Sequence, residues 1–307
     1  MQQAPARPNP NPAQTRGSSM QQWQIGKVKV TRIIELEVAG GTRFILPQAT
    51  PEAVKPMQWM VPHFATEDGK LIMSVHALVI ETPERLMLVD TCIGNDKIRS
   101  IPAWNLRHGP FLEELEKAGY VPEQFDTIMC THLHVDHVGW NTRLIDGIWV
   151  PTFPNARYLI GEQEFQYWSE VDPGTLSEDI MGDSIQPVLE AGLVDLVASD
   201  HRVCQEVRLE PTPGHTPGHV SIRIESEGEQ ALITGDCIHH PCQIEQLDWS
   251  SSADFDSTAA IETRKRLLAE HSDSQILIIG THFATPSAGY IKKTADTYYL
   301  DVFTNHT

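Results

Sequence analysis

The chain has 307 residues, of which 40% are hydrophobic, and a formal net charge of −18 from 41 acidic and 23 basic residues. This length is enough for one large domain or two small ones, and the apolar content is enough for a sizeable core. The sequence is acidic overall and contains no block of basic residues. This excludes the phosphate-binding surface that is typical of nucleic-acid-binding proteins. We therefore expect no nucleic-acid partner.

No run of apolar residues approaches the roughly 20 needed to span a bilayer, so we expect no membrane partner. Residues 1–19 are rich in Pro, Gln and Asn and lack the apolar centre of a secretory signal. We interpret them as a disordered extension or a remnant of cloning, and residues 20–307 as a single domain. Five scattered cysteines without a Cys-x-x-Cys pair favour a reducing compartment, and we predict a cytoplasmic location.

Alternating apolar residues and helical spacing predict an α/β fold. In the first half we expect strands at 27–38, 71–80, 86–89, 128–130 and 156–160, and helices at 111–118, 162–170 and 177–191. In the second half we expect strands at 203–209, 220–224, 231–233 and 275–279, with a helix over 260–268. Strands precede helices in both halves, which predicts two similar α/β units that share one core.

Residues 41–70 form an irregular segment with four prolines and unusual apolar content. Such a segment either packs as a loop onto its own domain or forms a wall or lid over a pocket. Both interpretations stay open for its large apolar side chains and for one further aromatic residue: Met57, Trp59, Met60, Phe64 and Trp140.

A cluster of metal-binding side chains follows the predicted strand at 128–130, in the run Thr131–Val138. His132 and His134 are two residues apart, so in an extended chain they share a face and can converge on one ion. A turn after them would direct Asp136 and His137 towards a second ion. Imidazole and carboxylate ligands suit Zn²⁺, while Mn, Fe and Co also accept such sites.

Three more candidate ligands lie downstream at similar places. Asp236 and His282 each follow an apolar strand, and His215 lies in a loop rich in Pro and Gly at 211–219. The seven candidates divide into two metal sites. We expect one site to consist of His132, His134 and His215, the other of Asp136, His137 and His282, with Asp236 bridging the two. Each ion keeps an open position, which is typical of a catalytic site.

These motifs resemble, in the same order, those of the metallo-β-lactamase superfamily over about residues 27 to 295. The matching segments are the His132–His137 cluster, Gly214-His215, Gly235-Asp236 and Gly280-Thr281-His282. Asp90 looks like the acidic residue that supports the metal site from behind in that family. The resemblance implies an αββα sandwich with a dinuclear metal site at one edge of the sheets, and zinc is the expected metal.

Particular residues point to one branch of this superfamily. His134 stands where the di-iron oxidoreductases usually have Glu, and Asp236 is present where true β-lactamases lack it. The segment Asp236-Cys237-Ile238-His239 resembles quorum-quenching acyl-homoserine lactonases and methyl parathion hydrolase. The resemblance also allows a homodimer.

The branch implies a hydrolase that opens a lactone or cleaves a small apolar ester, with an acyl-homoserine lactone as the leading substrate. A hydroxide shared by the two metals would attack the carbonyl carbon. An organophosphate triesterase is the alternative. A superfamily nuclease and a non-enzymatic metal-binding module are further alternatives, although the −18 charge opposes a nuclease.

His239 departs from the best-known lactonases, which carry Tyr at this position. It could donate a hydrogen bond or a proton to the substrate, or it could orient a metal ligand. Asp136 and Asp236 are the candidate proton carriers. We expect His219 and His240 to be structural or to support ligands, and Cys237 to be a small buried filler.

Overall fold

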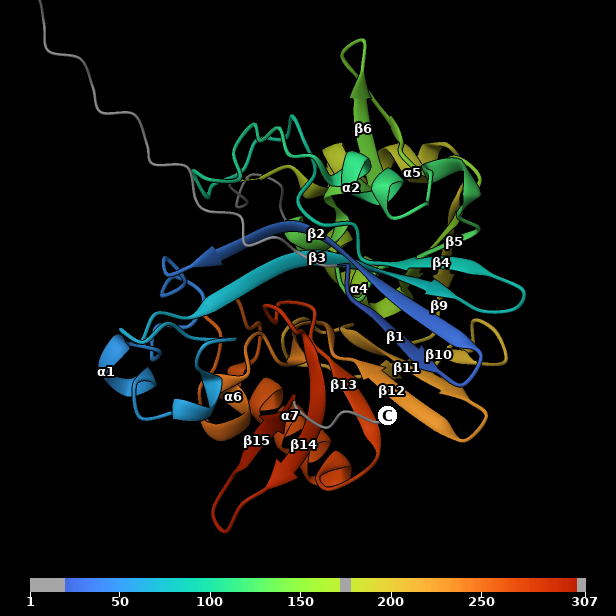
Figure 1. Ribbon diagram of the computed structural model, residues 1–307. Helices are drawn as coiled ribbons and strands as arrows, with labels where there is room; N and C mark the ends of the chain where they lie inside the picture. The colour runs from blue at the N-terminus through green and yellow to red at the C-terminus, as the bar shows by residue number, and fades with distance from the viewer. Residues whose placement is uncertain (1–19, 172–177, 303–307) are drawn as a thin grey trace, which may run out of the picture.

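The computed structural model describes residues 20–171 and 178–302. Two β-sheets face each other in the middle of the molecule, and helices cover their outer faces (Figure 1). The predicted α/β fold, an αββα sandwich, is therefore confirmed. Within the two described ranges, no helix is long and apolar enough to cross a membrane.

The first sheet has seven strands in the order β1-β2-β3-β4-β5-β8-β9. Strands β1 to β4 pair antiparallel, and β4, β5, β8 and β9 pair parallel. Their bounds are β1 Gln22–Ile25, β2 Val28–Ala39, β3 Ile72–Glu81, β4 Leu86–Val89, β5 Thr127–Met129, β8 Arg157–Gly161 and β9 Val194–Val197. A separate hairpin consists of β6 Thr142–Ile145 and β7 Ile148–Pro151.

The second sheet has six strands in sequence order, and within it β12 and β13 form a parallel pair. The bounds are β10 Val207–Pro211, β11 Val220–Ser226, β12 Glu229–Ile233, β13 Ile276–Ile279, β14 Ala288–Lys293 and β15 Tyr298–Asp301. The parallel pair requires a crossover, and the longest helix of the described chain lies in it.

The α-helices are α1 Pro51–Val54, α2 Phe111–Lys117, α3 Val135–Val138, α4 Glu162–Glu170, α5 Gln186–Glu190, α6 Cys242–Glu245 and α7 Ser257–His271. Short 3₁₀ turns lie at Gln58–Met60, Pro122–Gln124, Gly139–Asn141 and Gly235–Cys237. The N-cap residue of α7 is Asp256, whose carboxylate accepts hydrogen bonds from the backbone N–H groups of Thr258 and Ala259. Such a cap satisfies donors that a helix start leaves unpaired.

The helix predicted over 177–191 is present as an unbroken helical run over residues 180–190, part of which is π-helical. A π-helical turn at Met181–Ile185 precedes α5, and Ser177 lies outside the described residues. Pro187 has no N–H to donate to the carbonyl of Asp183, four residues earlier. That carbonyl instead accepts a hydrogen bond from Lys97 Nζ at 2.6 Å.

The space between the two sheets is filled by alternate side chains of both. On β3, for example, Leu78 and Ile80 point into this space, whereas Ala77 and Val79 point to the outer face. Successive residues of a strand point to opposite faces, so a strand with both faces covered is apolar throughout. This accounts for the nearly continuous apolar run of β3.

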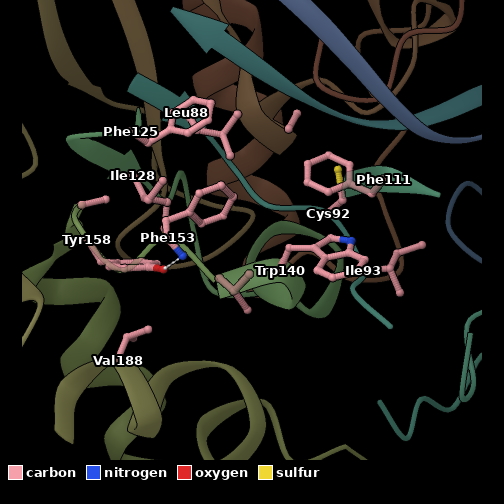
Figure 2. Close-up of a cluster of buried hydrophobic side chains, with 14 of the residues drawn as sticks. Leu88, Cys92, Ile93, Phe111, Phe125, Ile128, Trp140, Phe153, Tyr158 and Val188 are labelled. Atoms are coloured by element: carbon pink, nitrogen blue, oxygen red, sulfur yellow. Dashed lines mark hydrogen bonds between the residues drawn. The ribbon is translucent and has the colours of Figure 1, made fainter. Parts of the chain in front are cut away.

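Aromatic side chains fill the outer face of the first sheet beneath its helices (Figure 2). Phe111 of α2 stacks on Trp140 with ring centroids 5.7 Å apart. Phe153 and Tyr158 lie together nearby, and the Phe153 N–H donates to the Tyr158 hydroxyl at 3.2 Å. The hydroxyl is therefore satisfied, as a buried tyrosine requires.

Candidate metal centre

The predicted ligands come together because their strands end at the same edge. Strands β12 and β13 pair Ile233 with Ile279, so Asp236 and His282, each three residues further on, leave the sheet side by side. In the first sheet, β4 and β5 pair Val89 with Met129 just before Asp90 and His132. Parallel strands direct their carboxyl ends to one edge. The loop between β10 and β11 brings His215 to the same place.

Three imidazole rings form the first group. The Nε2 of His132 lies 3.0 Å from Nδ1 of His134, which lies 2.8 Å from Nε2 of His215. His132 and His215 are buried and His134 is half-buried. Three ring nitrogens thus point at a common position, as predicted.

Asp136, His137 and His282 form the second group. The Nε2 atoms of His137 and His282 are 3.3 Å apart. The carboxylate oxygens of Asp136 lie 3.8 Å from His137 Nε2 and 3.6 Å from His282 Nε2. This is the second predicted set, and the structure places all three members together.

Asp236 lies between the two groups and faces both. Its Oδ2 is 3.5 Å from His215 Nε2 and 3.4 Å from His137 Nε2. Its Oδ1 is 3.1 Å from His282 Nε2. Oδ2 therefore faces both groups and Oδ1 faces the second, so the carboxylate lies where a bridging ligand would lie. The roles of the seven side chains as ligands stay predictions.

Burial and neighbouring charges set the protonation of this cluster. Burial, together with neighbouring imidazoles, lowers the pKa of His132, His134 and His215 well below the ordinary value. These rings are therefore neutral at pH 7, which is the form that binds metal ions. Burial raises the pKa of Asp236, but the adjacent His282 and His137 outweigh it and hold that pKa well below its usual range.

The donor set fits a divalent cation. Three ring nitrogens of the first group converge on one position. A proton shared by two of them would still leave the lone pair of the third without a partner. A cation at their common position would be attracted to all three, and the carboxylates of Asp136 and Asp236 would offset its charge. Mixed imidazole and carboxylate sets suit Zn²⁺ and other first-row ions.

Each of four histidines is held at its other ring nitrogen. The fixed partners are Thr131 Oγ1 for His132 at 3.1 Å, Asp90 Oδ2 for His137 at 2.9 Å, Asp254 Oδ1 for His215 at 2.9 Å and the carbonyl of Ser74 for His282 at 2.9 Å. Such contacts orient a ring and select its tautomer. The structure places Asp90 where the resemblance implied. Asp254 and Ser74 were missed, because neither lies in a motif or beside a ligand in the sequence.

His219 supports the turn that carries Asp236. Its Nε2 accepts the backbone N–H of Asp236 at 2.8 Å, and its Nδ1 lies 2.9 Å from the Thr212 hydroxyl. Gly235, with φ of +54°, allows this approach, since a Cβ there would lie 2.5 Å from the His219 ring. The predicted supporting role of His219 agrees with these contacts.

Two other neighbours of the centre are structural, as predicted. His240 Nε2 lies 2.9 Å from the carbonyl oxygen of Phe64, away from the cluster. Cys237 is 1% exposed, and burial raises the pKa of its thiol to about 12. The thiol is therefore protonated at pH 7 and is a poor nucleophile.

A pocket of about 530 Å³ leads to the metal-binding cluster. Its floor includes His134, Asp136, Asp236 and His282. Its wall is mostly apolar and comes from β2, β3 and several loops. The main wall residues are Leu36, Val38, Phe44, Ile45, Met73, Val75, Ile101, Ala103, Trp104, Val135, Trp168 and Ile180. An apolar cavity of this size with few polar groups is typical of a small-molecule site.

His239 also lines this pocket and is 1% exposed. Its Nε2 is 3.3 Å from Asp236 Oδ2. Within the described part of the chain, neither of its ring nitrogens makes a hydrogen bond. A buried ring that makes no hydrogen bond is rare and needs an explanation, and a ligand in the pocket would supply one.

The pocket-wall interpretation of five apolar residues was wrong. Met57, Met60 and Phe64 are 2%, 0% and 1% exposed and pack in the core against the second sheet. Trp59 donates its Nε1–H to Glu245 at 2.6 Å, and Trp140 donates its own to Glu35 at 2.8 Å. The segment 41–70 does contribute to the wall, but through Phe44 and Ile45 near its start, and the other main wall residues lie outside it.

A family model agrees with this geometry. Residues 72–282, which run from β3 to the last predicted ligand, match the model of the metallo-beta-lactamase superfamily. The chain belongs to the metallo-β-lactamase superfamily. The matched region contains all seven predicted metal ligands.

Curated relatives in this superfamily include lactonases. An N-acyl homoserine lactonase of Bacillus cereus is 29% identical over 218 residues, which cover 66% of this chain and 78% of the relative. A probable metallo-hydrolase, YybB, of Bacillus subtilis is 26% identical over 200 residues, covering 62% of this chain and 77% of the relative.

Solved structures share the fold. The hydrolase AbOPH of the β-lactamase superfamily superposes with a TM-score of 0.76 at 24% identity, covering 94% of this chain and 99% of that one. AidC, a dizinc quorum-quenching lactonase, superposes with a TM-score of 0.73 at 22% identity, covering 92% and 96%. At these identities the likeness concerns the metallo-β-lactamase fold.

Proposed function

We propose that this protein is a metal-dependent hydrolase that opens lactones, with N-acyl homoserine lactones as the leading substrates. The observation that carries the proposal is the apolar pocket that ends on the cluster of seven candidate ligands. A substrate with an apolar tail and a reactive ester group fits such a site. The names of the curated relatives support lactone hydrolysis.

Two divalent ions, with zinc as the proposed metal, would be held by the two groups and by Asp236. When bound, such ions activate a water nucleophile and polarise a substrate carbonyl. The side chains of the protein would hold the substrate and transfer protons. Phe44 and Trp104, whose ring centroids are 6.5 Å apart, both line the pocket and would cover the apolar tail of a substrate.

His239 and Asp136 are the side chains we propose to act on the reacting atoms. His239 has two ring nitrogens without hydrogen bonds at the pocket floor, so it can donate to an oxygen that gains negative charge. The Asp136 carboxylate lines the same floor and can accept the proton of the nucleophile and return it to the leaving oxygen. Asp236 is the second candidate for this proton transfer.

Other parts of the hypothesis stay predictions: a homodimer, the absence of a nucleic-acid partner and a cytoplasmic location. For the last, none of the five cysteines, all in the described ranges, forms a disulfide. An organophosphate triesterase is the main competing activity, since the same centre could act on phosphorus.

A substrate panel tests the proposal. Zinc-loaded protein should be assayed with acyl-homoserine lactones, aryl esters, phosphotriesters and a β-lactam. We expect the highest kcat/KM for a lactone, and a loss of activity of at least about 100-fold in His134→Ala because one metal loses a ligand. His108→Ala is the matched control, because the His108 side chain is 74% exposed and outside the cluster.

Full activity of His134→Ala on the best substrate would refute the dinuclear centre. Phosphotriesters as the best substrates would replace the lactonase proposal with the triesterase. If the protein turns over no ester in a metal-dependent way, the remaining interpretation is a non-enzymatic metal-binding module.

A further inference from the structure

Glu164 is a buried carboxylate that the proposed chemistry does not use. It is the third residue of α4, directly after β8, and is 1% exposed, whereas its neighbours Glu162 and Gln163 are exposed. An unpaired buried carboxylate is costly, so its contacts need an explanation.

The Glu164 carboxylate accepts four hydrogen bonds, two on each oxygen. Oε1 accepts the backbone N–H of Leu133 at 3.0 Å and the indole N–H of Trp168 at 2.8 Å. Oε2 accepts the hydroxyl of Thr216 at 2.6 Å and the backbone N–H of Gly218 at 3.1 Å. Each of these four donors is thereby satisfied away from water.

These donors belong to the two segments that carry the first group of histidines. Leu133 lies between His132 and His134, and Thr216 directly follows His215. One carboxylate oxygen therefore holds the first segment and the other oxygen holds the second. The segments are 80 or more residues apart in the sequence, as the 81-residue separation of His134 and His215 shows.

Close packing leaves this arrangement little freedom. A Cβ on Gly218 would lie 2.2 Å from the backbone nitrogen of Glu164, so the loop passes directly over the start of α4. Trp168, which donates to Oε1, meets the ring of His134 edge to face at 5.5 Å. Its indole thereby links the carboxylate to the one half-buried ring of the group.

We propose that Glu164 is a positioning residue that sets the mutual geometry of His132, His134 and His215, and so the affinity of this group for its metal ion. The inference rests on the proposed metal centre but not on the identity of the substrate. A carboxylate is required because four donors converge on it. A glutamine would turn an amide N–H₂ towards one pair of donors and release one of the two segments.

Glu164→Gln tests this directly in the full-length, folded protein. Zinc and cobalt affinities are measured by competition with a chromophoric chelator, and the visible spectrum of the cobalt form reports ligand geometry. We expect one of two ions to bind about 10- to 100-fold more weakly, with an altered cobalt spectrum. Glu162→Gln, an exposed change on the same helix, is the matched control and should leave both readouts unchanged.

The outcomes separate this inference from the proposed activity. Wild-type affinities and cobalt spectrum in Glu164→Gln, even with a lowered melting temperature, would overturn the positioning role. If Glu164→Gln does not fold, Thr216→Val serves instead, because it removes a single hydrogen bond to Oε2. It should weaken the binding of the ion held by the first group, by a smaller factor. An unchanged affinity in Thr216→Val would also overturn the role. Wild-type protein that binds two ions but cleaves no lactone refutes the activity alone, and protein that binds none refutes both.

Discussion

His239 differs from the four histidines that are fixed from behind, since neither of its ring nitrogens has a hydrogen-bond partner among the described residues. Thr131, Asp90, Asp254 and the Ser74 carbonyl contact those four rings. Freedom of this kind suits a side chain that contacts the substrate. Imidazole can donate to an oxygen that gains charge, and preorganised donors of this kind contribute strongly to catalysis.

We expect His239→Phe to lower kcat on the best lactone by about 100-fold, because the ring shape remains while the donor is lost. Steady-state kinetics give kcat and KM, and elemental analysis gives the metal content, which should remain at two ions. Loss of a metal ion with the same kinetic defect would instead show that His239 orients a ligand.

At Gly235, a left-handed backbone and a crowded contact coincide. We expect Gly235→Ala to lower the free energy of unfolding by about 1 to 3 kcal/mol, because the residue keeps a strained φ and its Cβ meets the His219 ring at 2.5 Å. Urea denaturation measures the change. Gly228→Ala is the control, since Gly228 has φ of +88° and open space around it. Equal losses in both variants would mean that the contact with His219 adds nothing.

At the scale of elements, strands and loops together shape the pocket wall. Strands β2 and β3 provide one part of it, and the segments around Phe44 and Trp104 provide another. Phe44 is 51% exposed even though it lines the pocket. A substrate tail that covers this ring removes apolar surface from water, and each buried methylene contributes about 0.8 kcal/mol.

We therefore expect Phe44→Ala to flatten the dependence of kcat/KM on acyl-chain length. In the wild type, kcat/KM should rise up to about fourfold per added methylene for tails long enough to reach the ring. The measurement is kcat/KM across a series of lactones with linear acyl chains. Phe255→Ala is the matched control, because Phe255 is 60% exposed and outside the pocket. An unchanged chain-length profile in Phe44→Ala would place the tail elsewhere.

At the scale of the whole molecule, Lys97 is a buried cation that affects stability. Its Nζ donates to Thr142 Oγ1 at 2.8 Å and lies 3.4 Å from Asp183 Oδ1. Burial lowers the pKa of Lys97 to about 7, although Asp183 raises it in part and Arg99 and Asp96 also act on it. The unfolded chain keeps the ordinary value of 10.5.

Between pH 7 and 10.5 the unfolded state therefore binds one more proton at Lys97 than the folded state. Folding stability from this residue must rise with pH across that window, by about 1.4 kcal/mol per pH unit. We expect the unfolding free energy of the wild type minus that of Lys97→Met, measured in urea, to increase by about 1.4 kcal/mol per pH unit between about pH 7.5 and 9.5. A pH-independent difference would show that the Lys97 ammonium keeps its ordinary pKa.

The fold class and the residues that form the candidate metal centre could be predicted from the sequence. His132, His134, Asp136 and His137 lie within six residues, and Asp236 and His282 follow parallel strands. Residues that directly follow parallel strands lie at the same edge of the sheet, because the carboxyl ends of those strands lie there. The αββα sandwich followed from the same strands. Edge elements such as β1, β9 and β15 were missed, because short strands with mixed exposure lack a clear alternation.

Tertiary structure alone decided the pocket walls and the residues behind the ligands. Phe44 and Trp104 line the pocket while Met57 and Met60 pack in the core, although all four are apolar residues of irregular segments. The positioning role proposed for Glu164, which lies 52 residues from Thr216, depends on contacts between distant segments. Burial and hydrogen bonding depend on which elements pack together, and no local pattern in the chain carries that information.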